Sequence, residues 1–257
     1  MNAPVKRKPK SFWSRAWSRI RQSKMKIFIP IIVIAGGLVL LFPNKHNGFG
    51  GGRCRADAGP EVNWADCKKR MLMLKDSNFE KAKMAEADLS NSDFSRSKLV
   101  GADLTKAAII RTSFVKADLS SASLLKVEGY RSDFGSVVAT QTKFTMAEMQ
   151  RANFTDATLV GADFTKAELG RAVFKGAELG DTHFAMANLA RASFKSASMK
   201  GPVDFANAFL FLTRFEGVDL SQATGLKQDQ IALSCGNSKT KLPQGLTVPV
   251  EWPCEED

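Results

Sequence analysis

The sequence has only two histidines and four cysteines in 257 residues, and no cysteine lies between 68 and 234. His46 and His183 stand far apart, so the residues that most often serve as general bases or zinc ligands are not grouped. No glycine-rich segment follows an expected strand and opens an expected helix, so no phosphate-binding loop is indicated. These absences predict a non-enzyme with no catalytic residues, cofactor site or metal site.

Acidic residues are absent from residues 1–26, which carry nine Lys and Arg, although the whole chain has a net charge of +11. Residues 74–223 carry 19 basic and 18 acidic side chains, so the positive charge belongs to the N-terminal segment. A nearly neutral central region does not favour binding of nucleic acid, which attracts strongly basic surfaces.

Residues 27–42 form an apolar run without a charged side chain. As a helix they would span about 24 Å, less than the ~30 Å of a hydrocarbon core, and Lys26 could extend the anchor toward the interface. The run predicts a single uncleaved anchor in a bacterial inner membrane; a signal peptide cleaved after Ala35 is the alternative. The positive-inside rule places 1–26 in the cytoplasm. Both interpretations export the rest of the chain to the periplasm.

From about Phe79 to Leu220 a large apolar residue recurs at every fifth position, and a small residue often stands two places before it. A period of five matches neither an α-helix nor a β-strand, so internal repetition takes precedence over helix and strand patterns. One additional residue near Gly201 and Pro202 shifts the repeat.

A period of twenty overlies the period of five, which predicts a coil with four short sides whose equivalent residues stack on successive coils. The phenylalanines at one inward position predict a core column, made of Phe94, Phe114, Phe134, Phe154, Phe174, Phe194 and Phe215. Arginines recur with the same period at one outward position, at Arg111, Arg131, Arg151, Arg171 and Arg191.

The segments 87–91, 102–106 and 162–166 read ADLSN, ADLTK and ADFTK. They resemble the A-(D/N)-(L/F)-x-x units of the pentapeptide-repeat family, and the resemblance covers about 29 consecutive units. It implies an all-β solenoid, the right-handed quadrilateral β-helix of that family, with about seven coils over 74–223. The apolar run would make the chain a membrane-anchored bacterial member. The family hosts unrelated roles, so the fold does not identify the function.

The cysteines flank this predicted rod, with Cys54 and Cys67 before it and Cys235 and Cys254 after it. An even number in an exported region indicates two disulfides. Seven coils at about 4.8 Å would make a rod of about 35 Å, too long for a bond between its ends. The expected pairs are therefore Cys54–Cys67 and Cys235–Cys254; neither pair has the spacing of a zinc site.

Both ends of a solenoid need covers. We expect residues 43–73 to form a glycine-rich tether and an N-terminal cap. At the other end, 224–257 is expected to form a short capping helix near 226–233, with Thr224 as its N-cap, followed by a disulfide-held tail. The large inward residue is missing at Gly129 and Ala139, for which the sequence offers no explanation.

The arginine column allows two interpretations. Glu128, Glu148 and Glu168 stand three residues before three of the arginines, so the columns could neutralise each other as a surface ladder. Alternatively, the arginines could bind phosphate or carboxylate groups of an anionic envelope polymer or an acidic partner.

These observations predict a non-catalytic periplasmic scaffold for protein–protein interaction, with a second copy as one possible partner. Binding of an anionic envelope polymer is the alternative. The resemblance also raises DNA mimicry against a topoisomerase, but mimicry needs a strongly acidic cytoplasmic rod.

Overall fold

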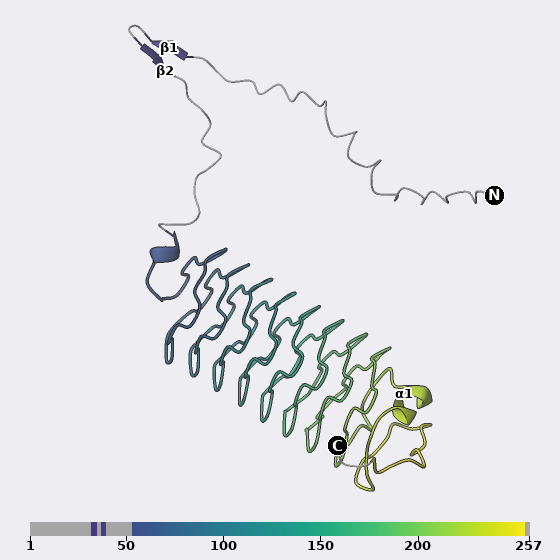
Figure 1. Ribbon diagram of the computed structural model, residues 1–257. Helices are drawn as coiled ribbons and strands as arrows, with labels where there is room; N and C mark the ends of the chain where they lie inside the picture. Colours follow the sequence, from purple (N-terminus) through teal and green to yellow (C-terminus); the bar gives the residue numbers. More distant parts are fainter. Residues whose placement is uncertain (1–31, 35–36, 40–52, 255–257) are drawn as a thin grey trace, which may run out of the picture. The chain divides into compact units, whose positions relative to one another are not determined.

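The computed structural model describes residues 32–34, 37–39 and 53–254 (Figure 1). The chain divides into two compact units, 1–49 and 50–257, which are considered separately. The predictions for residues 1–26 and for most of the tether lie outside the described residues.

In the first unit, the described residues form a short antiparallel hairpin. Strand β1 (Ile32–Ile34) pairs with β2 (Gly37–Val39), and Ile32 lies opposite Val39. These six residues therefore differ from the continuous helix predicted over 27–42, because β-branched residues favour strands and Gly37 weakens a helix. Within the part of the chain that the structure describes, no helix has the length and hydrophobicity that a membrane crossing requires.

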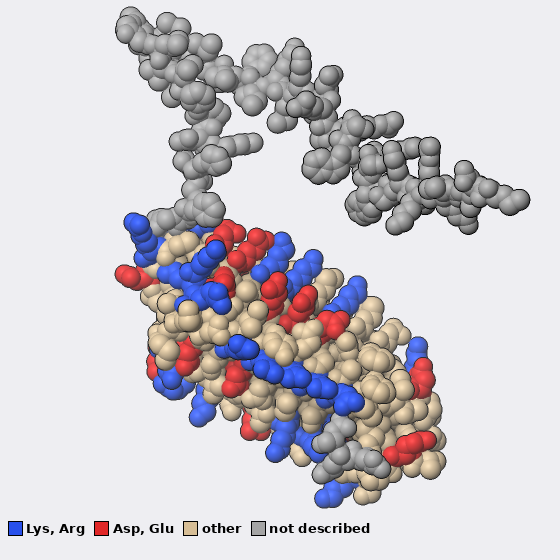
Figure 2. Space-filling model, viewed as in Figure 1, with Lys and Arg blue, Asp and Glu red and all other residues tan. Residues whose placement is uncertain are grey.

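The second unit is a four-sided β-solenoid, as the two periods predict. Residues twenty apart pair through isolated parallel bridges, and the spacing becomes 21 at His183 and Asp204, across the inserted residue. The bridges begin at Asn63 rather than near 74, so about eight coils fit between 61 and 221, one more than predicted. On the face that Figure 2 shows, charged side chains of both signs are spread among uncharged residues.

Each five-residue unit makes one side and one corner. The corner residue has a positive φ at every fifth position from 61 to 201 and again at 207, 212 and 217. The Asp or Asn before the large apolar residue supports this turn: Oδ1 of Asp103, for example, accepts the backbone N–H of Thr105 at 2.9 Å. Such local bonds are the reason that Asp and Asn suit this position.

The core consists of stacked side chains, and the predicted phenylalanine column is confirmed. Consecutive rings from Phe94 to Phe215 lie 4.7–5.3 Å apart and nearly parallel. A second column, from Phe144 to Phe205, stacks in the same way on the opposite side of the coil. Rings of the two columns meet edge to face, a favourable geometry for aromatic pairs.

Buried hydroxyls replace alanine at some of the small inward positions and bind the preceding coil. The hydroxyl of Thr112 donates to the carbonyl oxygen of Leu89 at 3.0 Å, and that of Thr142 to Leu119 at 2.7 Å. Because each hydroxyl has a partner, its burial carries no unpaired polar group.

At the N-terminal end, the predicted separate cap is wrong, because residues 61–73 already belong to the first coil. Trp64 occupies its core position, fully buried, with its ring 5.4 Å from that of Phe79. Its indole N–H donates to the carbonyl oxygen of Ala56 at 3.0 Å. The 3₁₀ helix η2 (Arg53–Arg55) leads into this coil, and Cys54 is bonded to Cys67 as predicted.

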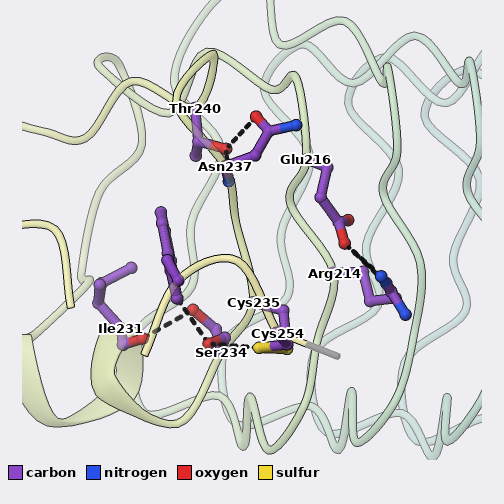
Figure 3. The surroundings of a disulfide bond; sticks show 9 residues. Arg214, Glu216, Ile231, Ser234, Cys235, Asn237, Thr240 and Cys254 are labelled. Carbon is purple, nitrogen blue, oxygen red and sulfur yellow. Dashed lines mark hydrogen bonds and ion pairs between the residues drawn. A yellow bond between two sulfur atoms is a disulfide. The ribbon is translucent and has the colours of Figure 1, made fainter. Parts of the chain in front are cut away.

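At the C-terminal end, helix α1 (Gln228–Ala232) lies within the predicted helical segment. Its N-cap is Lys227 rather than Thr224, which instead pairs with Asp204 in the ladder. Gln230 donates to the carbonyl oxygens of Phe205 and Ala208, at 3.1 and 2.8 Å, and so covers open carbonyls of the last coil. The tail is held by the predicted bond between Cys235 and Cys254 (Figure 3).

The missing core residue at Gly129 has a packing explanation. A Cβ atom on Gly129 would lie 3.3 Å from Cγ of Met149 and 3.4 Å from Cδ1 of Ile109. It would also lie 3.2 Å from Oγ of Ser132, whose hydroxyl donates to the Gly129 carbonyl oxygen. Longer side chains in the neighbouring coils therefore fill this place, and Gly129 leaves no dent.

Candidate interaction surface

The predicted arginines form an exposed row along one corner of the rod. Arg111, Arg131, Arg151, Arg171 and Arg191, here called the arginine row, have φ values between 54° and 61°. The positive φ turns each side chain outward at the corner, one per coil. Figure 2 shows a continuous row of basic side chains running along the rod, with acidic side chains in a parallel row beside it.

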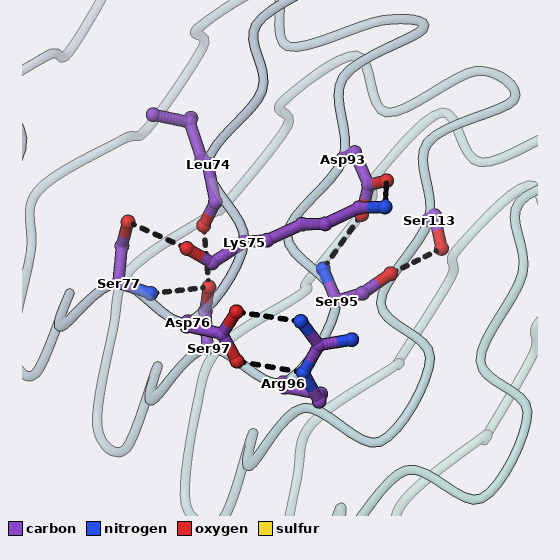
Figure 4. Close-up of polar contacts among 9 residues, drawn as sticks. All are labelled: Leu74, Lys75, Asp76, Ser77, Asp93, Ser95, Arg96, Ser97 and Ser113. Carbon is purple, nitrogen blue, oxygen red and sulfur yellow. Dashed lines mark hydrogen bonds and ion pairs between the residues drawn. The ribbon is translucent and has the colours of Figure 1, made fainter.

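Elsewhere on the rod, corner residues of opposite sign pair between successive coils (Figure 4). Two nitrogen atoms of Arg96 donate to the carboxylate of Asp76, both at 2.6 Å, and this hydrogen bond lowers the pKa of Asp76. Lys106 and Glu86 pair in the same way at 2.8 Å. Within the arginine row the residue twenty places away is another arginine, so this pairing is impossible.

The predicted neutralising ladder is not formed. Among residues 53–254, no ion pair joins Glu128, Glu148 or Glu168, here called the glutamate row, to Arg131, Arg151 or Arg171.

The reason is the position of the acidic residues on the sides of the coils. An acid at the equivalent place pairs with the residue 18 places earlier in the preceding coil, as Asp88 does with Arg70 and Asp93 with Lys75. For the glutamate row the residues in that place are uncharged, namely Ile110, Tyr130 and Gln150.

The two rows border one side of the rod, which we call the arginine face and which comprises 107–111, 127–131, 147–151, 167–171, 187–191 and 208–212. Between the rows the outward residues become smaller along the rod, from Tyr130 and Gln150 to Gly170 and Ala190. The side chain of Arg131 lies 5.2 Å from the ring of Tyr130, within cation–π distance. The face thus carries two parallel rows of opposite charge, and little bulk lies between them only at Gly170 and Ala190.

The last coil of this face carries an aromatic pair that the sequence interpretation missed. Phe209 and Phe211 are 50% and 41% exposed, and their rings lie 6.2 Å apart and nearly parallel. With Leu212 they form the aromatic end of the face. Phe209 pairs with Asn188 in the ladder, and Phe211 accepts the N–H of Arg191 through its carbonyl oxygen at 2.8 Å, so this end continues the two rows. The exposure of both rings could have been predicted from the five-residue repeat, since Phe209 and Phe211 occupy outward positions on either side of the buried Leu210.

His183 is the one histidine among residues 53–254. His183 is exposed and pairs with Asp163 in the ladder. Within residues 53–254, no group of three His, Cys, Asp or Glu side chains could hold a metal ion.

An open depression of about 510 Å³ near Cys254 is lined by Lys195, Arg214 and Lys239. Arg214 is paired with Glu216 at 2.7 Å there, which reduces its availability to a ligand.

Comparisons with known proteins agree with this geometry. Residues 107–184 match a family model described as a pentapeptide repeat region, and residues 74–109 match one described as pentapeptide repeats. No curated protein matches the chain.

Several solved structures are similar to the chain. A trypsin-treated variant of QnrB1, a plasmid-mediated fluoroquinolone resistance protein, is 19% identical over 73% of this chain and 91% of its own, with a TM-score of 0.49. HetL from Nostoc sp. strain PCC 7120, involved in heterocyst differentiation regulation, is 19% identical over 76% and 87%, with a TM-score of 0.28. A pentapeptide-repeat protein of the Arabidopsis thaliana thylakoid lumen is 17% identical over 65% and 80%, with a TM-score of 0.17.

The five-residue units that build the sides of the rod are the same units that the family models match, so residues 74–184 belong to the pentapeptide-repeat family.

Proposed function

We propose that the chain is a single-pass, membrane-anchored scaffold of a bacterial envelope, with a periplasmic rod that binds other proteins and catalyses no reaction. The observation that carries the proposal is the arginine face, where two rows of opposite charge and an aromatic pair are exposed. Arg131, Arg151 and Arg171 form no ion pair among residues 53–254, so these three side chains are available to another molecule.

The location rests on the sequence and on the disulfides. A basic segment followed by an apolar run is typical of an N-in membrane anchor. Two disulfides, one at each end of the rod, suit an oxidising compartment such as the periplasm.

The location can be tested by labelling the four cysteines in cells with a membrane-impermeant thiol reagent, before and after reduction. Labelling of intact cells after reduction alone supports an exported, disulfide-bonded rod. Thiols that label only after lysis, without reduction, would overturn both the location and the anchor.

The scaffold role can be tested by placing a photo-crosslinking residue at each corner of one coil, at Gln141, Met146, Arg151 and Asp156. We expect protein adducts at some corners and not at others, because a docked partner covers part of the circumference. Equal or absent adducts at all four corners would contradict the role.

The alternative, an anionic polymer held by the arginine row, has less support. The glutamate row lies on the same face and would repel a polyanion wide enough to cover both rows. DNA mimicry has no support, since the rod carries nearly equal numbers of basic and acidic side chains.

A further inference from the structure

The arginine face is complementary to itself. On successive coils one edge of the face carries Glu128, Glu148 and Glu168, while the other edge carries Arg131, Arg151 and Arg171. If two such faces meet about a two-fold axis parallel to the rod, left and right edges exchange while the level along the rod is kept. Each glutamate of one copy then faces an arginine of the other at the same level.

The same two-fold rotation also brings together compatible residues on the coils that lack a glutamate–arginine pair. At the last coil Phe209 faces Leu212 of the second copy, and Phe211, near the midline of the face, faces its own equivalent. One coil earlier the amide of Asn188 donates to the Glu168 carboxylate of its own chain at 2.8 Å, and Ala190 lies near the midline. Apolar residues therefore meet apolar residues, and charges meet opposite charges.

We propose that two copies of this protein associate side by side and in parallel through the arginine face. The two-fold axis runs along the rods, with Gly170 and Ala190 near the midline. An antiparallel arrangement would place each row against its own like charges, so the charge pattern selects the parallel one. This inference goes beyond the proposed function and does not depend on it, although two copies anchored in one membrane would also be parallel.

The chemistry of the face suggests a weak pair that tethering strengthens. The opposed rows are solvent-exposed charges, which contribute little each and are screened by salt, and the aromatic end supplies most of the apolar area. Confinement of both copies to one membrane raises their effective concentration. The experiment should therefore use the full chain in membranes as well as in detergent.

The test compares two alanines that differ only in the side of the rod they occupy. Ala190 lies on the arginine face, whereas Ala185 has the equivalent place on the adjacent side of the same coil, and both are partly exposed. Full-length Ala190→Cys and Ala185→Cys chains are treated with a short bifunctional maleimide and separated on gels. We expect a covalent dimer for Ala190→Cys, at least tenfold more than for Ala185→Cys. Equal yields, or none from Ala190→Cys, would overturn the proposal.

Exchange of the charge rows tests the pairing itself. Added to Ala190→Cys, the triple change Arg131→Glu, Arg151→Glu and Arg171→Glu places acid against acid and should reduce the dimer at least tenfold. A further Glu128→Arg, Glu148→Arg and Glu168→Arg restores opposite signs and should restore the dimer. If the arginine-reversed chain still dimerises, charge pairing is refuted; if it does not fold, the comparison of the two alanines decides.

The result separates this inference from the proposed function. Absence of the dimer in a chain that labels as exported would refute side-by-side pairing and leave the scaffold role intact. Adducts from position 190 to other proteins, without the dimer, would assign the face to a different partner and also overturn the inference. A dimer in a chain that is not exported would refute the location alone.

Discussion

The indole N–H of Trp252 donates to the backbone carbonyl oxygen of Ser234 at 2.7 Å, although 18 residues separate the two in sequence. Ser234 precedes Cys235, which is bonded to Cys254 two residues after the tryptophan. A Cβ atom on Gly236 would collide with the indole ring, so the ring lies directly against the backbone there. The tail is thus fixed to the end of the solenoid by a hydrogen bond, a close packing contact and a covalent bond.

Removal of this disulfide should destabilise the C-terminal end. Cys235→Ser with Cys254→Ser releases a loop closed over 19 residues, and we expect the free energy of unfolding to fall by about 3 kcal/mol. Urea unfolding measures the loss, and hydrogen exchange at α1 shows whether it begins at this end. The double change Cys54→Ser with Cys67→Ser is the control, because its exchange should increase near η2 instead. Unchanged stability of the first variant would mean that Trp252 and Gln230 suffice as a cap.

Restoring the repeat at Gly129 should destabilise the rod. Gly129→Leu matches the five-residue pattern, but its side chain would enter space already held by Met149, Ile109 and Ser132. Overpacking of this kind costs about 1–3 kcal/mol, which thermal and urea unfolding can measure. Gly170→Ala on the same face is the control, since its Cβ would have no contact closer than 3.8 Å. A more stable Gly129→Leu variant would refute this packing account.

The two kinds of phenylalanine should respond differently to truncation. Phe154 is fully buried, with Phe134 and Phe174 stacked on it at 4.9 and 5.0 Å, and Phe154→Ala should cost about 3–5 kcal/mol. Phe211 is 41% exposed, and Phe211→Ala should change the free energy of unfolding by less than about 1 kcal/mol. Both changes in the free energy of unfolding can be measured by chemical unfolding of monomeric protein at low concentration. Similar losses would mean that Phe211 belongs to the core.

The ion pair between Asp219 and Lys241 should contribute a small, pH-dependent stabilisation. A hydrogen bond from Lys241, at 2.8 Å, and others from Ser221 lower the pKa of Asp219 to about 2. Since an unfolded aspartate titrates near 3.9, the stabilisation is complete above about pH 4 and disappears as the pH falls through about 2. Both side chains are largely exposed, so solvent screening keeps the effect small.

Asp219→Asn should therefore unfold at a slightly lower temperature than the native chain at pH 7, and at the same temperature near pH 2. Glu178→Gln, at a partly exposed position elsewhere on the rod, should show no such convergence. A difference that persists at pH 2 would assign the effect of Asp219→Asn to something other than its charge.

Much of the structure of the rod can be predicted from the sequence, because five residues make one side and twenty residues make one coil. The buried phenylalanine column, the inserted residue near Gly201 and both disulfides can be derived from spacing alone. The start of the coil was placed too late because Trp64 and Cys67 replace the usual residues of the repeat in the first coil. Spacing identifies which positions are equivalent, but not which unusual residues can occupy them.

The surface was harder to predict because one dimension of sequence does not show which residues face one another between coils. Glu128 and Arg131 are only three residues apart in sequence. On this rod, however, an acidic residue on the side of a coil pairs with the residue 18 places earlier, and a charged residue at a corner pairs with the residue twenty places away. Phe209 and Phe211 lie outside the pattern of large inward residues, so the sequence interpretation gave them no role. Their exposure becomes visible only when each residue is assigned to an inward or outward position.

Because one coil contains twenty residues, the length of the rod can change without any change in the direction in which its outer side chains point. Deletion of 141–160 would remove one full circuit, shorten the rod by about 4.8 Å and leave every column aligned with its former neighbours. Deletion of five residues would remove only a quarter of a circuit and turn everything beyond it by one side, so the arginines before and after the cut would point in directions about 90° apart. The length of the rod can therefore change by whole coils without altering the arginine face. A change of one five-residue unit, the smallest that the repeat allows, would instead split the arginine face between two sides of the rod.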